Sequence, residues 1–118
     1  MKIYISGKIT GLEPAVYSAN FEKKEKELLR SGYQVFNPVK EAQKLEQRIE
    51  RTLQRKPTYA EYMDYAIRGL LDCDGICQLN DWQKSNGAKC EYQVAISCGK
   101  IFVKPKIVKR GIHGWILG

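Results

Sequence analysis

Seven consecutive residues combine a carboxylate with the residue types that begin a helix. They read Ser85-Asn86-Gly87-Ala88-Lys89-Cys90-Glu91. Ser85 or Asn86 can cap the first free backbone N–H groups, and Gly87 lets the backbone come close to a ligand. Because the start of a helix favours negative charge, we expect an anion-binding pocket there, with Glu91 held ionised beside the ligand.

A second candidate segment follows the first predicted strand. It comprises Ser6, Gly7, Lys8, Ile9, Thr10 and Gly11. Its backbone N–H groups, the Thr10 hydroxyl and the Lys8 ammonium group could receive a phosphate or a sugar. A solvated turn is the alternative interpretation. Together the two segments predict a site for a sugar or a nucleotide.

The apolar periodicity predicts strands that alternate with helices. The strands are expected at residues 2–6, 33–36, 74–79 and 100–104, and helices at 15–31, 39–56, from Thr58 through a capping box, and 87–98. Such alternation implies right-handed crossovers, a three-layer α/β fold and a four- or five-stranded, mostly parallel sheet. Ligands gather at the carboxyl ends of parallel strands, where both candidate segments fall.

The helix at 87–98 has a predicted apolar stripe, and cysteines occur within or beside it. The stripe consists of Ala88, Tyr92, Ala95 and Ile96. The four cysteines contain no C-x-x-C pair, so we interpret them as buried, reduced thiols: Cys73, Cys77, Cys90 and Cys98. The single histidine, His113, cannot complete a zinc site without them. We therefore assign no metal and no cofactor.

The length and composition limit the classes of protein. The 118 residues suffice for a single domain, and the net charge of +7 favours phosphate-bearing partners. No apolar run approaches the roughly 20 residues of a membrane span, and the chain begins directly in a strand, so we expect a cytoplasmic protein without a membrane partner. Residues 105–118 could form an edge strand or contact a neighbouring subunit.

Three sequence blocks together resemble the nucleoside 2-deoxyribosyltransferase-like superfamily. They are Tyr4-Ile5-Ser6-Gly7-Lys8-Ile9-Thr10-Gly11, Cys73-Asp74-Gly75-Ile76, and Trp82 with Ser85-x-Gly87-Ala88-x-x-Glu91. The superfamily includes deoxynucleoside-monophosphate N-glycosidases and uncharacterised phage and bacterial relatives. The resemblance covers residues 1 to about 103 and implies a flavodoxin-like, Rossmann-like fold. It also implies cleavage or exchange of the N-glycosidic bond of a deoxyribonucleoside or its 5′-monophosphate.

The resemblance also implies roles for individual residues. Glu91 matches the family nucleophile, Tyr4 matches the hydroxyl that orients it, and Ser85 matches a phosphate-binding serine. From the residues alone, Glu91 could instead complement a helix start, and Tyr4 could simply pack in the core. Trp82 could stack on a base or pack against the protein. The family resemblance suggests a homodimer or larger ring, to which the tail segment Ile112-His113-Gly114-Trp115 could contribute.

One departure concerns the acid that assists the leaving base. The family places an aspartate eight positions before the start of the third strand, where this chain has Ala66. Asp64 is two residues away, and two helical steps rotate a side chain by about 200°, so it is no simple substitute. Asp81, after the third strand, is the better candidate acid, whereas Asp74 has a structural interpretation.

Three functional hypotheses follow. The first is an N-glycosidic-bond hydrolase or deoxyribosyltransferase that acts on a small nucleoside or nucleotide, with Glu91, Tyr4 and Asp81 as catalytic residues. The second is a non-catalytic nucleotide-binding or signalling module of the same fold. The third is a basic protein that binds nucleic acid through these residues: Lys100, Lys104, Lys106, Lys109 and Arg110. We rank it lowest because no RNA- or DNA-binding motif accompanies their charge.

Overall fold

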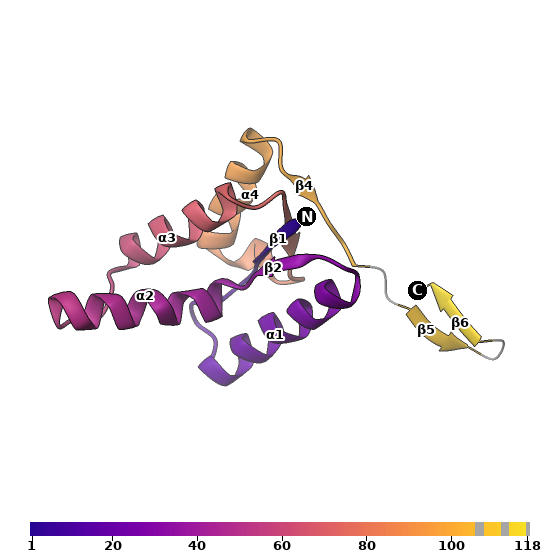
Figure 1. Ribbon diagram of the computed structural model, residues 1–118, viewed down its shortest axis with the longest axis horizontal. Helices are drawn as coiled ribbons and strands as arrows, with labels where there is room; N and C mark the ends of the chain where they lie inside the picture. Colours follow the sequence, from indigo (N-terminus) through magenta and orange to yellow (C-terminus); the bar gives the residue numbers. More distant parts are fainter. Residues whose placement is uncertain (106–107, 112–113, 118) are drawn as a thin grey trace.

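The computed structural model of the chain describes residues 1–105, 108–111 and 114–117. Its helices and strands follow one another along the chain as shown in Figure 1. They are β1 (Lys2–Ser6), α1 (Pro14–Arg30), β2 (Gln34–Phe36), α2 (Pro38–Leu53), α3 (Tyr59–Leu71), β3 (Gly75–Gln78), the 3-10 turn η1 (Trp82–Lys84), α4 (Asn86–Ser97), β4 (Ile101–Phe102), β5 (Val108–Gly111) and β6 (Gly114–Leu117).

The main sheet has four parallel strands in the order β2-β1-β3-β4. This arrangement confirms the predicted three-layer α/β fold, which is Rossmann-like and flavodoxin-like. The sheet has no fifth strand within the described residues, because β5 and β6 pair with each other as a second, antiparallel sheet. Ile112 and His113, which we considered for a subunit contact, lie outside the described residues.

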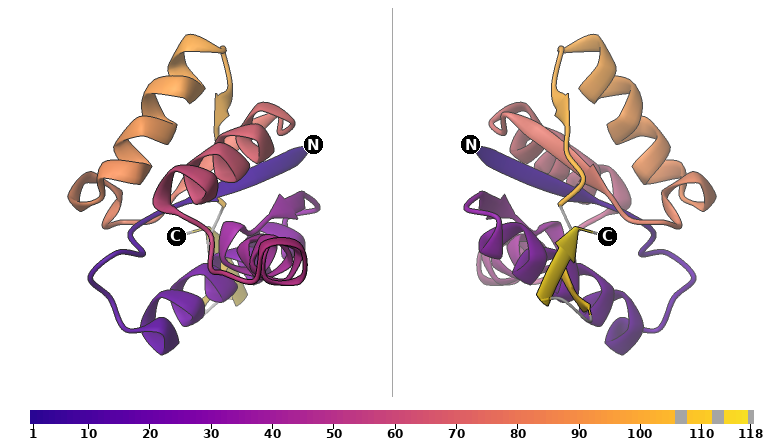
Figure 2. Two further views of the ribbon diagram at one scale, coloured as in Figure 1. Left: turned by 90° about the vertical axis from the view of Figure 1, so that its left-hand side faces the viewer. Right: turned by 90° about the vertical axis from the view of Figure 1, so that its right-hand side faces the viewer.

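Helices cover both faces of the sheet (Figure 2). On one face, Phe21 and Leu28 of α1 pack against Ile3 and Ile5 of β1. The other face meets α3 and α4, with apolar contacts among Tyr4, Ile76, Leu70 and Ala95. Alternating residues of β1 therefore face opposite layers, and Tyr4 and Ser6 share the α3/α4 face.

The capping box predicted at the start of α3 is present. The Thr58 side chain accepts from the Glu61 N–H at 3.2 Å, and Glu61 Oε1 accepts from the Thr58 N–H at 2.9 Å. This reciprocal pair satisfies two backbone donors that the helix itself cannot. None of the helices in the described residues has the length and apolarity of a membrane span.

Two predictions about burial are wrong. Ile96 is 50% exposed and does not belong to the core stripe of α4. Among the cysteines, Cys73 and Cys77 are buried, but Cys90 and Cys98 are exposed. The buried positions of α4 are Ala88, Glu91 and Ala95. Their i, i+3, i+7 spacing leaves the exposed residues on the other side of the helix.

We expect Gly69→Ala to destabilise the fold by about 1–2 kcal/mol. A Cβ at Gly69 would lie 2.3 Å from Cζ of Phe36. Overpacking costs about 1–3 kcal/mol, which exceeds the gain of up to about 1 kcal/mol from replacing a helical glycine. Urea unfolding measures the difference, and Gln93→Ala on the exposed side of α4 serves as the control. Unchanged stability of Gly69→Ala would contradict this packing.

Candidate functional site

Glu91 lies on the buried side of α4, although it is a carboxylate. It occupies the stripe between Ala88 and Ala95, and 7% of the residue is exposed. The small side chains of Ala88 and Ala95 let α4 approach the sheet closely. Glu91 follows the first turn of α4, which begins at Asn86, so its contacts come from side chains rather than from the free N–H groups of the helix start.

Two hydroxyl groups of β1 hold the carboxylate. The Tyr4 hydroxyl donates to Oε2 of Glu91, and the Ser6 hydroxyl donates to Oε1 at 2.7 Å. Because the donors are two residues apart on one strand, both project from the same face of the sheet. The strand thus sets the position of the carboxylate through one hydrogen bond to each oxygen.

Packing fixes the ring of Tyr4. It stacks on Phe36 of β2, with ring centroids 5.3 Å apart and an interplanar angle of 17°. Gly69 of α3 leaves the space that the Phe36 ring occupies. Burial, and next the neighbouring Glu91, raise the pKa of Tyr4 well above its usual value. The phenol is therefore a neutral hydrogen-bond donor at ordinary pH.

Burial dominates the ionisation of Glu91. It raises the pKa of the carboxyl group to about 7, while the hydrogen bonds from Tyr4 and Ser6 act to lower it. The expectation that the helix start holds Glu91 fully ionised is therefore wrong, because desolvation outweighs the groups that favour the charge. Near neutral pH the carboxyl group is poised between its two protonation states.

We expect Tyr4→Phe to raise the pKa of Glu91 above about 7. The hydrogen bond from the Tyr4 hydroxyl stabilises the ionised carboxylate, and the variant lacks it. Titration of the Glu91 carboxyl carbon by NMR measures the change. Tyr92→Phe is the matched control, since the Tyr92 ring stacks on Trp82 and belongs to a different cluster. An unchanged or lower pKa in Tyr4→Phe would contradict the proposed role of the hydroxyl.

Asp81, in the loop after β3, contacts the loop that follows β1 (residues 7–11), called the first loop below. Its Oδ1 accepts a hydrogen bond from the backbone N–H of Lys8 at 3.2 Å. Gly7 packs closely against Leu79, since a Cβ there would lie 2.5 Å from Leu79 Cδ1. Asp81 thus binds the first loop directly. Thr10 and Gly11 at the tip of that loop are exposed, whereas Lys8 and Ile9 are half-buried.

The start of α4 uses Ser85 for local structure. The Ser85 hydroxyl accepts from the Ala88 N–H at 3.1 Å, so of the two predicted caps it is Ser85, and not Asn86, that caps α4. A Cβ at Gly87 would contact Met63 Sδ at 3.4 Å, an ordinary van der Waals distance, so the packing of α4 against α3 does not by itself require a glycine there. Ser85 still has its own proton to donate.

Trp82 packs against the protein. Its ring stacks on Tyr92 with centroids 4.8 Å apart, and Tyr92 meets Phe102 edge-on at 5.7 Å. One face of Trp82 is therefore used within the chain, as the packing interpretation predicts. These aromatic contacts connect η1, α4 and β4.

The acidic residues near the third strand have structural partners. Asp64 is exposed and pairs with Arg68 of the same helix at 3.0 Å. It therefore points to a different side of the helix from Ala66, as the rotation of about 200° between the two positions predicts. Ala66 packs on the apolar cluster that contains Tyr4. Asp74 accepts from the Lys2 backbone N–H at 2.8 Å, which fits its predicted structural role. Helix α3 therefore presents a methyl group, rather than a carboxylate, to the layer beneath Tyr4.

The described residues show no cluster of three or more His, Cys, Asp and Glu that could hold a metal ion. Sequence reasoning named Ser6 as a loop contact but missed its bond to Glu91. It also missed Phe36 as the residue that fixes Tyr4. The i, i+2 spacing of two hydroxyl residues in a strand was the available signal for Ser6.

Residues 1–104 match the family described as Domain of unknown function (DUF4406). The chain belongs to the DUF4406 family. The match contains the four-stranded sheet and α1 to α4, and it leaves β5 and β6 outside. No curated protein and no solved structure matches the chain.

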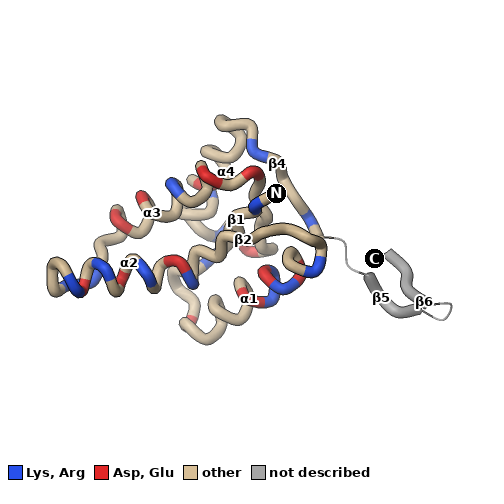
Figure 3. The backbone as a smooth tube through the Cα atoms, in the orientation of Figure 1, with Lys and Arg blue, Asp and Glu red and all other residues tan. Residues whose placement is uncertain are grey.

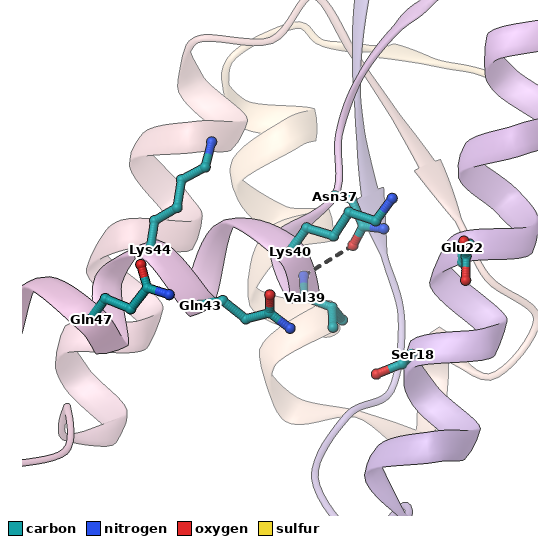
Figure 4. Close-up of a pocket in the computed structure, with 8 residues that line it drawn as sticks. All are labelled: Ser18, Glu22, Asn37, Val39, Lys40, Gln43, Lys44 and Gln47. Atoms are coloured by element: carbon teal, nitrogen blue, oxygen red, sulfur yellow. Dashed lines mark hydrogen bonds between the residues drawn. The ribbon is translucent and has the colours of Figure 1, made fainter.

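A cavity of about 430 Å³ lies between α1 and the start of α2 (Figure 4), and Glu91 is not among the residues that line it. Most of the residues that line it have polar or charged side chains, and Val39 is the apolar one: Ser18, Glu22, Asn37, Val39, Lys40, Gln43, Lys44 and Gln47. Lys40 pairs with Glu25 at 2.9 Å, and Lys44 pairs with Glu41 at 3.0 Å. These pairs offset the positive charge of the lining, so the cavity carries no strong signal for an anion.

Acidic and basic residues are interspersed along α1, α2 and α3 (Figure 3). Lys100, which we considered for nucleic-acid binding, donates to the Leu71 and Cys73 carbonyls at 2.8 and 2.7 Å. It therefore satisfies backbone oxygens where α3 ends. Lys106 lies outside the described residues.

Proposed function

We propose that the protein cleaves or exchanges the N-glycosidic bond of a deoxynucleoside or deoxynucleoside 5′-monophosphate. The observation that carries the proposal is the buried Glu91 carboxylate, held by the hydroxyl groups of Tyr4 and Ser6 at the carboxyl end of β1. A buried acid that has no cation beside it within the described residues is costly for folding, so its presence favours a chemical role. The resemblance to the nucleoside 2-deoxyribosyltransferase-like superfamily supplies the substrate class.

In the proposed reaction, an oxygen of ionised Glu91 attacks the anomeric carbon, and the C–N bond breaks with its electron pair on the base. The base takes up a proton as it leaves. Water, or a second base, then attacks the same carbon and releases Glu91. Tyr4 and Ser6 orient the nucleophile, and the Ser85 hydroxyl with the first loop would receive a 5′-phosphate.

We assign the leaving-group proton to Asp81. Its Oδ1 accepts the Lys8 N–H, and its Oδ2 makes no hydrogen bond within the described part of the chain. Trp82, the neighbouring residue, would border the base through whatever ring surface Tyr92 leaves uncovered. The tail and a second copy of the chain would complete the pocket, in a homodimer or larger assembly.

The direct test is incubation of the full chain with the common deoxynucleosides and their 5′-monophosphates, followed by chromatography. Release or exchange of free base supports the proposal. Binding without either reaction supports the second candidate, a nucleotide-binding module, which the apolar packing of Ala66 favours because α3 supplies no acid.

In Asp81→Asn, which removes the titration of the proposed acid, we expect kcat/KM for base release to rise with pH through about 7. The attacking group must be ionised, and burial raises the pKa of Glu91 to about 7. Below that pH the protonated carboxyl group is a poor nucleophile, so the rate falls about tenfold per pH unit. Rates measured between pH 5 and 9 test this; a rate that is flat across the range would contradict the assignment of Glu91.

A further inference from the structure

Gln78 has a buried hydrogen-bond donor without a partner. Its Nε2 is the one buried side-chain nitrogen or oxygen in the described residues for which the structure shows no hydrogen bond. The residue as a whole is half-buried, so the side chain reaches the boundary of the core. Buried polar groups in folded proteins are almost always paired, so an orphaned amide calls for an explanation.

The register of the sheet places Gln78 next to the Glu91 site. Gln78 is the last residue of β3, and it pairs with Ser6 of β1. Neighbouring strands lie about 4.8 Å apart, and residues in register project from the same face. Ser6 donates to Glu91 on that face, so the Gln78 side chain leaves the sheet beside the same carboxylate.

The packing of the preceding residues confirms this side. Tyr4 and Ile76 are partners in the register and both belong to the cluster with Leu70. Ile5 and Cys77 are the next partners, and both belong to the cluster on the opposite face. Gln78 therefore follows Ile76 on the α3/α4 face, at the carboxyl edge of the sheet.

An apolar side chain would fit this place without leaving a donor unpaired. The residues before and after Gln78, Cys77 and Leu79, are buried. At such a position the Nε2 group loses its hydrogen bonds to water and gains none within the described residues. Because Nε2 itself is shielded from solvent while the residue is half-buried, the amide would turn about its side-chain bonds to meet a ligand oxygen at the end of β3, which would satisfy the donor.

We propose that Gln78 is a ligand-contacting residue whose Nε2 donates to a hydroxyl oxygen of a pentose bound against Glu91. The assignment to the sugar rests on the proposed function and on position. A group one strand away from Ser6 reaches the part of the ligand that carries the reacting carbon, rather than the distant end of the base. Gln78 thereby selects for a pentose with a hydroxyl group at that point.

The test is the affinity of Gln78→Met, which keeps the length of the side chain and removes the amide. Calorimetry in a Glu91→Gln background, where the ligand is not consumed, uses three sets of probes: the common deoxynucleosides, their 5′-monophosphates and 2-deoxyribose 5-phosphate. We expect the Kd of pentose-bearing probes to rise about tenfold, the effect of one hydrogen bond. The matched control is Gln34→Met, an exposed glutamine at the start of β2, whose Kd should not change.

A readout without ligand separates binding from structure. Because the donor has no partner in the part of the chain that the structure describes, the Tm of Gln78→Met should equal or exceed that of the parent. A Tm lower by several degrees, or failure of both Gln78→Met and Gln78→Leu to fold while Gln34→Met folds, would show that the amide is structural and overturn the inference. An unchanged Kd, or no binding of any pentose-bearing probe, would overturn it as well.

These outcomes are distinct from those for the proposed function. Weakened binding in Gln78→Met without any base release supports the contact and removes only the chemistry. Base release with an unchanged Kd in Gln78→Met supports the chemistry and removes only the contact.

Discussion

Glu91→Gln should lower the rate of base release at least about 10³-fold, while the Kd for the same nucleoside or nucleotide stays within a few-fold. The amide has nearly the same shape as the carboxylic acid but cannot attack the anomeric carbon. Its oxygen can still accept from Tyr4 or Ser6, the two donors that hold Glu91. Chromatography of released base and calorimetry measure the two quantities separately.

The matched control is Glu13→Gln, which changes an exposed glutamate that precedes α1 and makes no side-chain cap. It should leave both quantities unchanged. Retention of most of the activity by Glu91→Gln would remove Glu91 as the nucleophile. A parallel loss of binding would show instead that the carboxylate holds the ligand.

Above pH 8, Glu91→Gln should increase the free energy of unfolding by about 2 kcal/mol. Burial raises the pKa of Glu91 from 4.5 to about 7 in the folded protein. Below pH 4.5 the group is protonated in both states and costs nothing. As the pH rises, the unfolded chain ionises first, so the folded state loses stability until the pH passes about 7.

The size of this loss follows from the shift in pKa. A change from 4.5 to about 7 corresponds to about 3 kcal/mol at high pH. Glutamine avoids that cost, but it leaves one of the two hydroxyl groups without its acceptor, which costs about 1 kcal/mol. The expected net gain is therefore about 2 kcal/mol at pH 8.5, and the difference at pH 5 should be within about 1 kcal/mol.

Urea unfolding of both proteins at pH 5 and 8.5 measures this dependence on pH, with Glu13→Gln as the control that should show none. A variant that is less stable than the parent at pH 8.5 would mean that the ionised carboxylate stabilises the fold. Loss of activity together with a gain in stability is the pattern of a residue retained for function.

The sequence by itself determined most of the architecture. Alternating apolar patterns located the four parallel strands and the helices between them, and Thr58 and Glu61 marked the start of α3 through local hydrogen bonds. Ser85 was one of the two residues predicted to cap α4, and it is the cap. Such features depend on neighbours within a few residues, so the residue types and their spacing are sufficient to predict them.

Only the tertiary structure decided the state of Glu91 and its partners. Local reasoning placed the carboxylate at a helix start and expected it to be ionised, whereas the fold buries it and raises its pKa to about 7. Its contacts with Tyr4 and Ser6 join residues more than 80 positions apart. The unpaired amide of Gln78 is likewise invisible along the chain. Desolvation depends on everything packed around a group, and no local pattern contains that information.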